Sequence, residues 1–154
     1  MMNSNLSSAR PFPERLIVAA NRLTRIAALA TGSTTPASVW RSLSILETDG
    51  SLRIGELARR SRVTQPTMTK LIQGLAEDEL IYRIADVADS RAWLIAITPK
   101  GTAALDAWRV EVGAALAPTF EGLSAEESEI LERAVAILEE RTETARVATR
   151  DEVA

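Results

Sequence analysis

Apolar residues recur at helical spacing over most of the chain, and two extended runs interrupt this pattern near the middle. Residues 12–30 carry apolar side chains every three to four positions, which predicts a helix. The segment TGSTT, residues 31–35, interrupts it. A second helix follows, with Thr35 expected as its N-cap and Pro36 as its first residue. It should end at Gly50, because glycine accepts the left-handed conformation after a helix.

The next two helices are short and closely spaced. One is predicted over residues 54–60, and the other begins at Thr64. The connection, residues 61–63, has the length that a helix-turn-helix uses. The inward stripe of the second helix of this pair is predicted to comprise Met68, Leu71, Ile72 and Leu75.

Two extended runs follow, and helices resume after them. LIYRI (80–84) and AWLIAI (92–97) are rich in β-branched and aromatic residues, and a polar loop, residues 85–91, separates them. Thr98-Pro99 and the capping box at residues 124–127 each open a further helix. We therefore expect a mainly α fold with one small β-hairpin.

The composition excludes several classes of chemistry. The 154 residues include neither cysteine nor histidine, so disulfides, thiolate metal sites and the commonest general base are absent. The sequence has no glycine-rich phosphate loop and no carboxylate pair of recognisable spacing. We expect no catalytic residues, no metal site and no cofactor, and an enzyme is a remote alternative. No apolar run approaches the roughly 18 residues of a membrane span, and the N-terminus has no apolar leader segment, which favours a cytoplasmic protein.

The net charge of −3 conceals two regions of opposite sign. Residues 53–70 contain five basic residues and one acid, a balance of +4, whereas residues 119–154 contain ten acids and four arginines, a balance of −6. Phosphate binding depends on the local patch more than on the net charge. The basic region coincides with the helix-turn-helix pair and predicts duplex DNA as a partner.

The outward side of the helix that begins at Thr64 carries amides and hydroxyls. Groups that both donate and accept hydrogen bonds suit base edges in the major groove, where carboxylates would meet phosphates. The candidate base contacts are Gln65, Thr69, Lys70 and Gln73. The candidate phosphate contacts are Thr64, Thr67, Arg59 and Arg62. The alternative is a solvated helix face.

The hairpin beside this helix is expected to be the wing of a winged helix. Arg91 stands at the end of its loop, where a guanidinium could enter a narrow minor groove. Asp89 would repel phosphate if it were free. We expect Asp89 to pair with an arginine, either Arg91 or one in the helices, and to orient it.

Two segments of the chain form specific motifs, IGELARRSRVTQPTMTKLIQGLAEDELIYR (54–83) and DSRAWLIAITPKG (89–101). Through these motifs the chain resembles the MarR family of winged helix-turn-helix transcriptional regulators. In two departures, Arg53 stands where the family often has a Ser or Thr cap, and Arg62 occupies a turn position where Gly is frequent. Either Arg62 adopts positive φ at some cost, or the turn differs locally from that of the family.

The resemblance implies a homodimer that binds a palindromic operator and acts as a repressor. It divides the chain into an N-terminal dimerisation helix (1–35), a winged helix-turn-helix DNA-binding lobe (36–98) and C-terminal dimerisation helices (99–154). The alternative function is a winged-helix protein-interaction module that does not bind DNA.

The resemblance also implies a small aromatic or phenolic effector between the dimerisation helices and the DNA-binding lobe. Trp40 is a candidate for the lining of this pocket, and Arg41 and Tyr82 are further candidates. The competing interpretation for Trp40, as for Trp93 and Trp108, is packing in the core, because each tryptophan lies on an apolar stripe.

Overall fold

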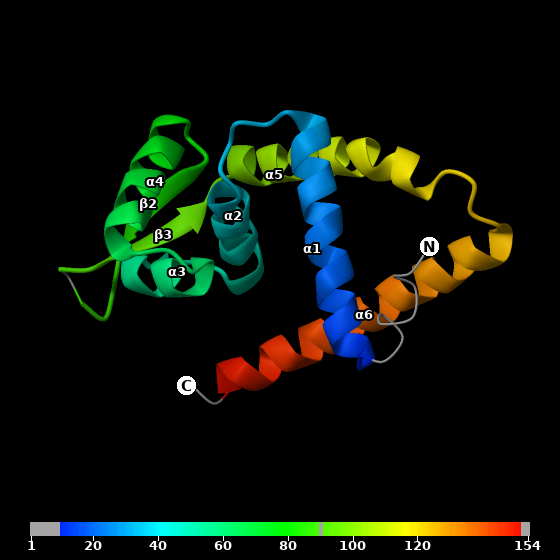
Figure 1. Ribbon diagram of the computed structural model, residues 1–154. Coiled ribbons are helices and arrows are strands. Elements are labelled where there is room, and N and C mark those ends of the chain that lie inside the picture. Colours follow the sequence, from blue (N-terminus) through cyan, green and yellow to red (C-terminus); the bar gives the residue numbers. More distant parts are fainter. Residues whose placement is uncertain (1–9, 90, 152–154) are drawn as a thin grey trace. The chain divides into compact units, whose positions relative to one another are not determined.

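The computed structural model of the chain describes residues 10–89 and 91–151, and side chains among them up to Arg146. Ser90 of the wing loop and the ends of the two predicted dimerisation regions lie outside the described residues. The elements, in chain order, are α1 (Phe12–Thr31), α2 (Ala37–Asp49), β1 (Leu52–Arg53), α3 (Ile54–Ser61), α4 (Gln65–Glu77), β2 (Ile81–Ala85), β3 (Trp93–Ile97), α5 (Pro99–Leu116), the 3-10 helix η1 (Ala117–Phe120) and α6 (Ala125–Asp151) (Figure 1). The chain forms two compact units, one ending at Leu116 and the other beginning at Ala117. This mainly helical architecture with a small β-hairpin confirms the predicted fold class.

The start of α2 corrects one prediction. Pro36 has φ −59° and ψ 140°, so its backbone is extended and it lies in the N-cap position, one residue before the helix. Thr35 is therefore not the cap, because it stands outside the helix by a further residue. Its backbone N–H donates to the hydroxyl of Ser33 at 3.3 Å instead. The predicted end is confirmed, since the helix ends at Asp49, but Gly50 has φ 80° and ψ −160° and so does not adopt the expected left-handed helical conformation.

The turn between α3 and α4 is built around Arg62, which adopts φ 56°, the first of the two alternatives that the sequence left open. Hydrogen bonds hold this turn against α2. The buried hydroxyls of Ser42 and Ser61 are 2.9 Å apart, and Nη1 of Arg41 donates to the carbonyl of Ser61 at 2.9 Å. α2 therefore fixes the turn that positions α4.

The sheet has three antiparallel strands in the order β1-β3-β2. Ile81 pairs with Ile97 and Ala85 with Trp93, so both extended runs form strands, as the sequence predicts. The pairing of Leu52 with Ile95 adds β1, which escapes prediction from the sequence because it has only two residues. The wing hairpin is thereby joined to the start of α3.

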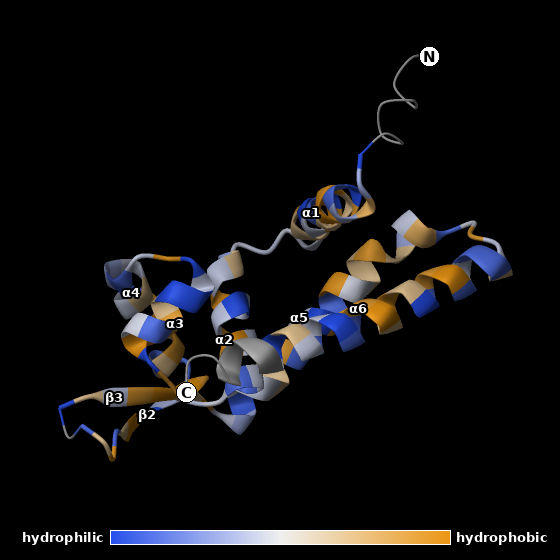
Figure 2. Cartoon of the chain, turned by 90° about the horizontal axis from the view of Figure 1, so that it is seen from below, coloured by the Kyte–Doolittle hydropathy of each residue, from blue (hydrophilic) through white to orange (hydrophobic). Residues whose placement is uncertain are grey.

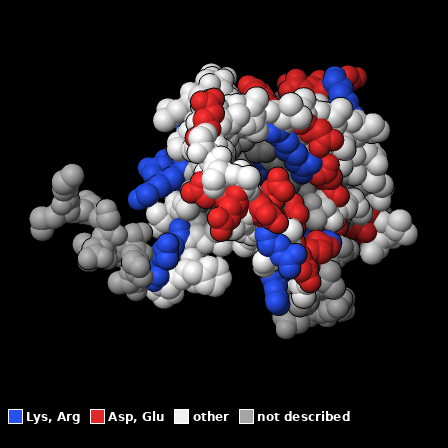
Figure 3. All heavy atoms as spheres, turned by 90° about the vertical axis from the view of Figure 1, so that its right-hand side faces the viewer, with Lys and Arg blue, Asp and Glu red and all other residues white. Residues whose placement is uncertain are grey.

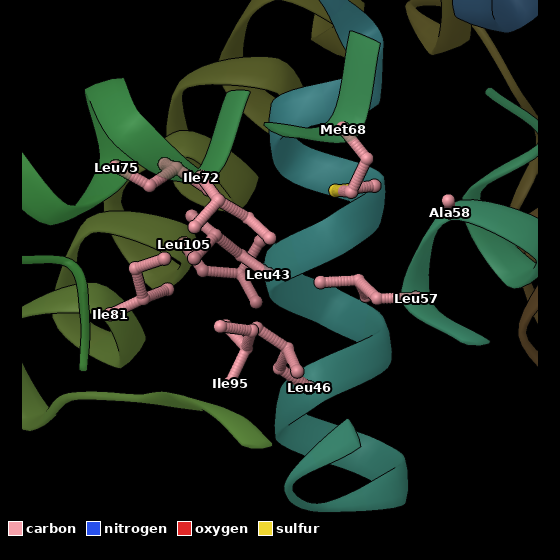
Figure 4. Close-up of a cluster of buried hydrophobic side chains, with 10 residues drawn as sticks. All are labelled: Leu43, Leu46, Leu57, Ala58, Met68, Ile72, Leu75, Ile81, Ile95 and Leu105. Atoms are coloured by element: carbon pink, nitrogen blue, oxygen red, sulfur yellow. The ribbon is translucent and has the colours of Figure 1, made fainter. Parts of the chain in front are cut away.

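The core of the first unit lies among α2, α3, α4, the sheet and α5. Figure 4 shows side chains from all of these elements pointing toward one another around α2, and the cluster comprises Leu43, Leu46, Leu57, Ala58, Met68, Ile72, Leu75, Ile81, Ile95 and Leu105. Trp40 and Trp108 stack with ring centroids 5.2 Å apart at the edge of this core. Trp93 does not join them: 55% of it is exposed, because it lies toward the tip of the hairpin, beyond the reach of the core.

The second unit consists of η1 and α6. Ser124 and Glu127 form the predicted capping box, with the hydroxyl of Ser124 accepting from the Glu127 N–H at 3.1 Å and the Glu127 carboxylate accepting from the Ser124 N–H at 2.9 Å. None of the described side chains of α6 is buried. Within the described chain, every helix is too short or too polar to cross a membrane.

Candidate nucleic-acid interface

The helix α4 buries one side and leaves the opposite side free. Met68, Ile72 and Leu75 lie in the core. The exposed residues of its first three turns include the predicted base contacts, namely Gln65, Thr69, Lys70 and Gln73, and also Thr67. Because this amide-and-hydroxyl side does not pack against its own unit, it is available to a partner.

The first turn of α4 is held by threonines. The Oγ1 of Thr64 accepts from the N–H of Thr67 at 3.3 Å, and the two hydroxyls are 2.8 Å apart, so Thr64 is the N-cap. Pro66 lies in the first turn, where its missing N–H costs nothing. Acidic residues are absent until Glu77, to which Nε2 of Gln73 donates at 3.2 Å. The N-terminal turns of α4 therefore present no carboxylate to an approaching phosphate.

The base of the wing loop is fixed by an ion pair that joins it to β1. Nη2 of Arg53 lies 2.6 Å from the carboxylate of Asp86. This carboxylate also accepts from the N–H of Ala88, and these two contacts, with the Ala88 bond first, lower the pKa of Asp86. The loop thus has an ordered start. Because Arg53 and Asp86 are 33 residues apart in sequence, only the fold reveals this pair.

Asp89 contacts the backbone of Arg91. Its Oδ1 accepts from the Arg91 N–H at 3.1 Å, which shapes the turn that carries this arginine. The pairing of Asp89 with an arginine side chain stays a prediction. Arg91 is exposed and takes part in no salt bridge among the described residues.

The basic cluster of α3 is largely neutralised. Glu56 binds Arg59 at 2.7 Å and Arg60 at 2.5 Å, and Arg60 also reaches Asp49 at 2.6 Å. The two arginines, Arg59 first, hold the pKa of Glu56 at about 2. The local balance of +4 therefore overstates the charge that these arginines offer to phosphate. Around α4 and the wing, the cations that join no salt bridge among the described residues are Arg62, Lys70, Arg83 and Arg91.

The depressed pKa of Glu56 predicts an acid-sensitive junction between α2 and α3. A carboxyl whose folded pKa lies below its unfolded value stabilises the fold above the unfolded pKa, here 4.5, and this contribution is lost as the pH falls toward about 2. We expect Glu56→Gln to lower the urea midpoint at neutral pH and to lower it much less at pH about 3, where the parent has already lost much of this contribution. Glu111→Gln, an exposed change on α5, is the control. Equal loss for Glu56→Gln at both pH values would contradict this account.

The three candidate residues for a ligand pocket do not all line the same cavity in the structure. A cavity of about 470 Å³ lies between α2 and α4 and is lined in part by Trp40, Lys70, Leu71 and Gly74. Arg41 and Tyr82 are not among its lining residues. Nε1 of Trp40 is buried and has no hydrogen-bond partner among the described residues.

Arg83 is the residue near this interface that the sequence analysis missed. It lies on β2 opposite Ile95, and it lines a crevice with Thr69 of α4 and Arg91 of the wing. The signal was present in the strand pattern. Side chains alternate between the two faces of a strand, so Arg83 shares the face of the buried Ile81 and is directed toward the helices.

The comparisons with known proteins match this arrangement. The family model described as the MarR family matches residues 36–93. The HTH-type transcriptional repressor YetL of Bacillus subtilis (strain 168) is 33% identical over 93 residues, which are 60% of this chain and 56% of YetL. The chain thus spans little more than half the length of this curated relative.

Two solved structures share the fold. A mutant of S. aureus MepR bound to an oligodeoxyribonucleotide has a TM-score of 0.58 at 19% identity, over 86% of this chain and 99% of the MepR chain. Bordetella bronchiseptica BpsR, whose DNA binding is regulated by 6-hydroxynicotinic acid, has a TM-score of 0.55 at 21% identity, over 85% of this chain and 94% of BpsR. The MarR family model lies on the helix-turn-helix and most of the wing, so residues 36–93 are similar to the winged helix-turn-helix of that family.

Proposed function

We propose that the protein is a homodimeric repressor that binds a palindromic operator in duplex DNA. The observation that carries this proposal is the exposed side of α4, where amides, hydroxyls and Lys70 face outward with no carboxylate in the first three turns. Such a side matches the donors and acceptors of the major groove. α4 is accordingly the recognition helix, and Arg91 on the wing reaches the adjacent minor groove. MepR, which shares the fold, was solved with bound DNA.

The second copy is supported by apolar surface that each of the two units by itself leaves uncovered. Figure 2 shows hydrophobic residues along α1 and α6. The large exposed ones on these two helices include Phe12, Ile17, Leu29, Ile130, Val135 and Ile137. A monomer rarely exposes so much apolar surface unless a partner covers it. Two-fold symmetry would present two copies of α4 to half-sites about 34 Å apart.

The acidic character of α6 suits a position away from DNA. Between Ala125 and Arg146 the helix carries seven glutamates and three arginines. Figure 3 shows one face of the molecule on which acidic side chains are prominent. Such a surface repels phosphate, which favours the dimerisation role for this helix over a DNA contact.

The cavity beside Trp40 is the site we propose for a small aromatic or phenolic effector. It suits an aromatic ring because its lining is mainly apolar and includes the side chain of Trp40. Lys70 lines the same cavity, so a bound anion would draw it away from DNA. BpsR offers a precedent in an aromatic acid that regulates DNA binding. An effector acts only by binding one dimer geometry better than another.

This effector hypothesis predicts that a phenolic or aromatic acid weakens operator binding by the parent protein. The Trp40→Phe variant, which removes part of the cavity wall, should need a higher concentration of the acid for the same loss of DNA affinity. DNA affinity measured across a set of such acids is the test. If none of them changes the affinity, the effector part of the proposal fails and the DNA-binding part stands.

The DNA-binding proposal is tested by genomic footprinting of the bound protein, followed by gel shifts on the recovered site and on random duplex at low salt. We expect a palindromic footprint and a steep decline of affinity with salt. No retardation of either duplex at low salt would overturn the proposal and favour the alternative, a winged-helix module that binds another protein.

A further inference from the structure

A crevice of about 570 Å³ separates α4 from the wing. One wall is formed by the first turn of α3 and by α4, including Thr69, and the other wall is formed by β2 and β3, including Trp93. The charged side chains that line it are Arg53, Glu56, Arg83 and Arg91. The crevice therefore lies between the two elements that the proposed function places in neighbouring grooves.

The charges in this crevice are unequally compensated. Glu56 is bound by Arg59 and Arg60, outside the crevice lining, and Arg53 is bound by Asp86. Arg83 and Arg91 form no salt bridge with any residue in the described ranges. Two uncompensated guanidinium groups remain, and they favour an anion between the walls.

Arg83 is held more firmly than Arg91. It stands in the middle of β2, paired with Ile95 in the sheet, whereas Arg91 lies in the loop before β3. Two residues away on the same face of the strand, Ile81 is buried in the core, which fixes the direction of the Arg83 side chain toward the crevice. The strand therefore fixes the side of the sheet from which the Arg83 side chain extends, which is the side of the crevice.

We propose that the crevice seats the DNA backbone strand that runs between the major and the minor groove, and that Arg83 binds a phosphodiester of this strand. The inference rests on the proposed function. A protein that places a helix in one groove and a wing in the next must straddle the sugar-phosphate strand between them. A guanidinium can donate two parallel hydrogen bonds to the phosphate oxygens.

The test compares Arg83→Gln with the parent on the footprinted operator and on random duplex over a salt series. Each phosphate contact contributes about 0.9 to the slope of log affinity against log salt, so the loss of one contact in each half of a dimer should reduce the slope by about 1.8. Affinity should fall roughly tenfold on both duplexes alike, because phosphate contacts carry no sequence information. Arg83→Lys, which keeps the charge, should retain most of the slope.

Arg133→Gln on α6 is the matched control and should behave like the parent. Circular dichroism of each variant shows whether it folds, and Arg83→Met is a second neutral variant if Arg83→Gln does not. If the folded neutral variant shows the same dependence of affinity on salt as the parent, Arg83 does not bind a phosphate and this inference is wrong. The proposed function would still stand, because the parent itself binds DNA. A loss of affinity for the operator without a loss of affinity for random duplex would also contradict the phosphate contact, since this pattern indicates a contact to bases. Absence of binding by the parent refutes the proposed function itself.

Discussion

Replacing Gly101 with alanine is expected to destabilise the fold by on the order of 3 kcal/mol, because the new methyl group has no space. A Cβ at this position would lie 2.1 Å from the carbonyl oxygen of Leu80 and 2.8 Å from Cγ1 of Ile97. The carbonyl cannot yield easily, since it is backbone and accepts the N–H of Thr98 at 3.0 Å. The first turn of α5 would have to move away from the turn that leads from α4 into β2.

Gly113→Ala, in the same helix, is the matched control for this prediction. No neighbouring atom lies within 4 Å of a Cβ built at Gly113, so the change should be neutral or stabilise the helix by roughly 0.5–1 kcal/mol through the better helix propensity of alanine. Thermal unfolding of the three proteins is the measurement. We expect Gly101→Ala to lower the midpoint by roughly 10 °C. A shift as small as that of Gly113→Ala would show that the α5 junction adjusts without cost.

The elements that the sequence predicts well are those whose signals are local. The N-cap Thr64, the buried stripe of α4 and the capping box at Ser124 each depend on residues within a few positions of one another. The positive φ of Arg62 was one of two alternatives, because the sequence places this residue in the turn between two helices without excluding a different turn. Local hydrogen bonding and helical periodicity decide such features.

The features that were missed depend on contacts between distant segments. β1 is too short to have a pattern of its own and becomes a strand only when β3 lies beside it. Trp93 lies on an apolar stripe, yet the hairpin extends past the core and leaves it exposed. The start of α2 was mispredicted for a different reason, since Pro36 suits the N-cap as well as the first helical position and sequence alone does not distinguish them.

The candidate site shows the same division. The exposed side of α4 was predictable because its inward stripe fixes its outward one. The positive charge available to a phosphate was not predictable, because a sum of charges along the chain ignores which carboxylates form salt bridges with each arginine. The partners of Glu56 include Arg59, three residues on, which helical periodicity places on the same face. The partnership of Arg53 with Asp86 requires the sheet.

Lys70→Ala and Arg91→Ala are expected to give the largest losses of operator affinity, about tenfold or more each, for two different physical reasons. Lys70 stands on the outward side of α4, in the major groove of the proposed complex, where a good contact to a base is worth roughly 1–3 kcal/mol. Arg91 stands at the end of the wing loop, where the negative potential of a narrow minor groove attracts a guanidinium. Both losses occur twice in a dimer, and both should flatten the dependence of affinity on salt.

Operators altered at one place at a time separate the two contributions. Changing the base pairs under α4 should cost the parent affinity and should cost Lys70→Ala less, because the discriminating contact is already gone. Replacing A·T pairs by G·C under the wing widens the minor groove, and this change should cost Arg91→Ala less than it costs the parent. Arg133→Gln on α6 should follow the parent throughout. If both alanine variants bound every operator as the parent does across the salt series, α4 and the wing loop would not be the surface that meets DNA.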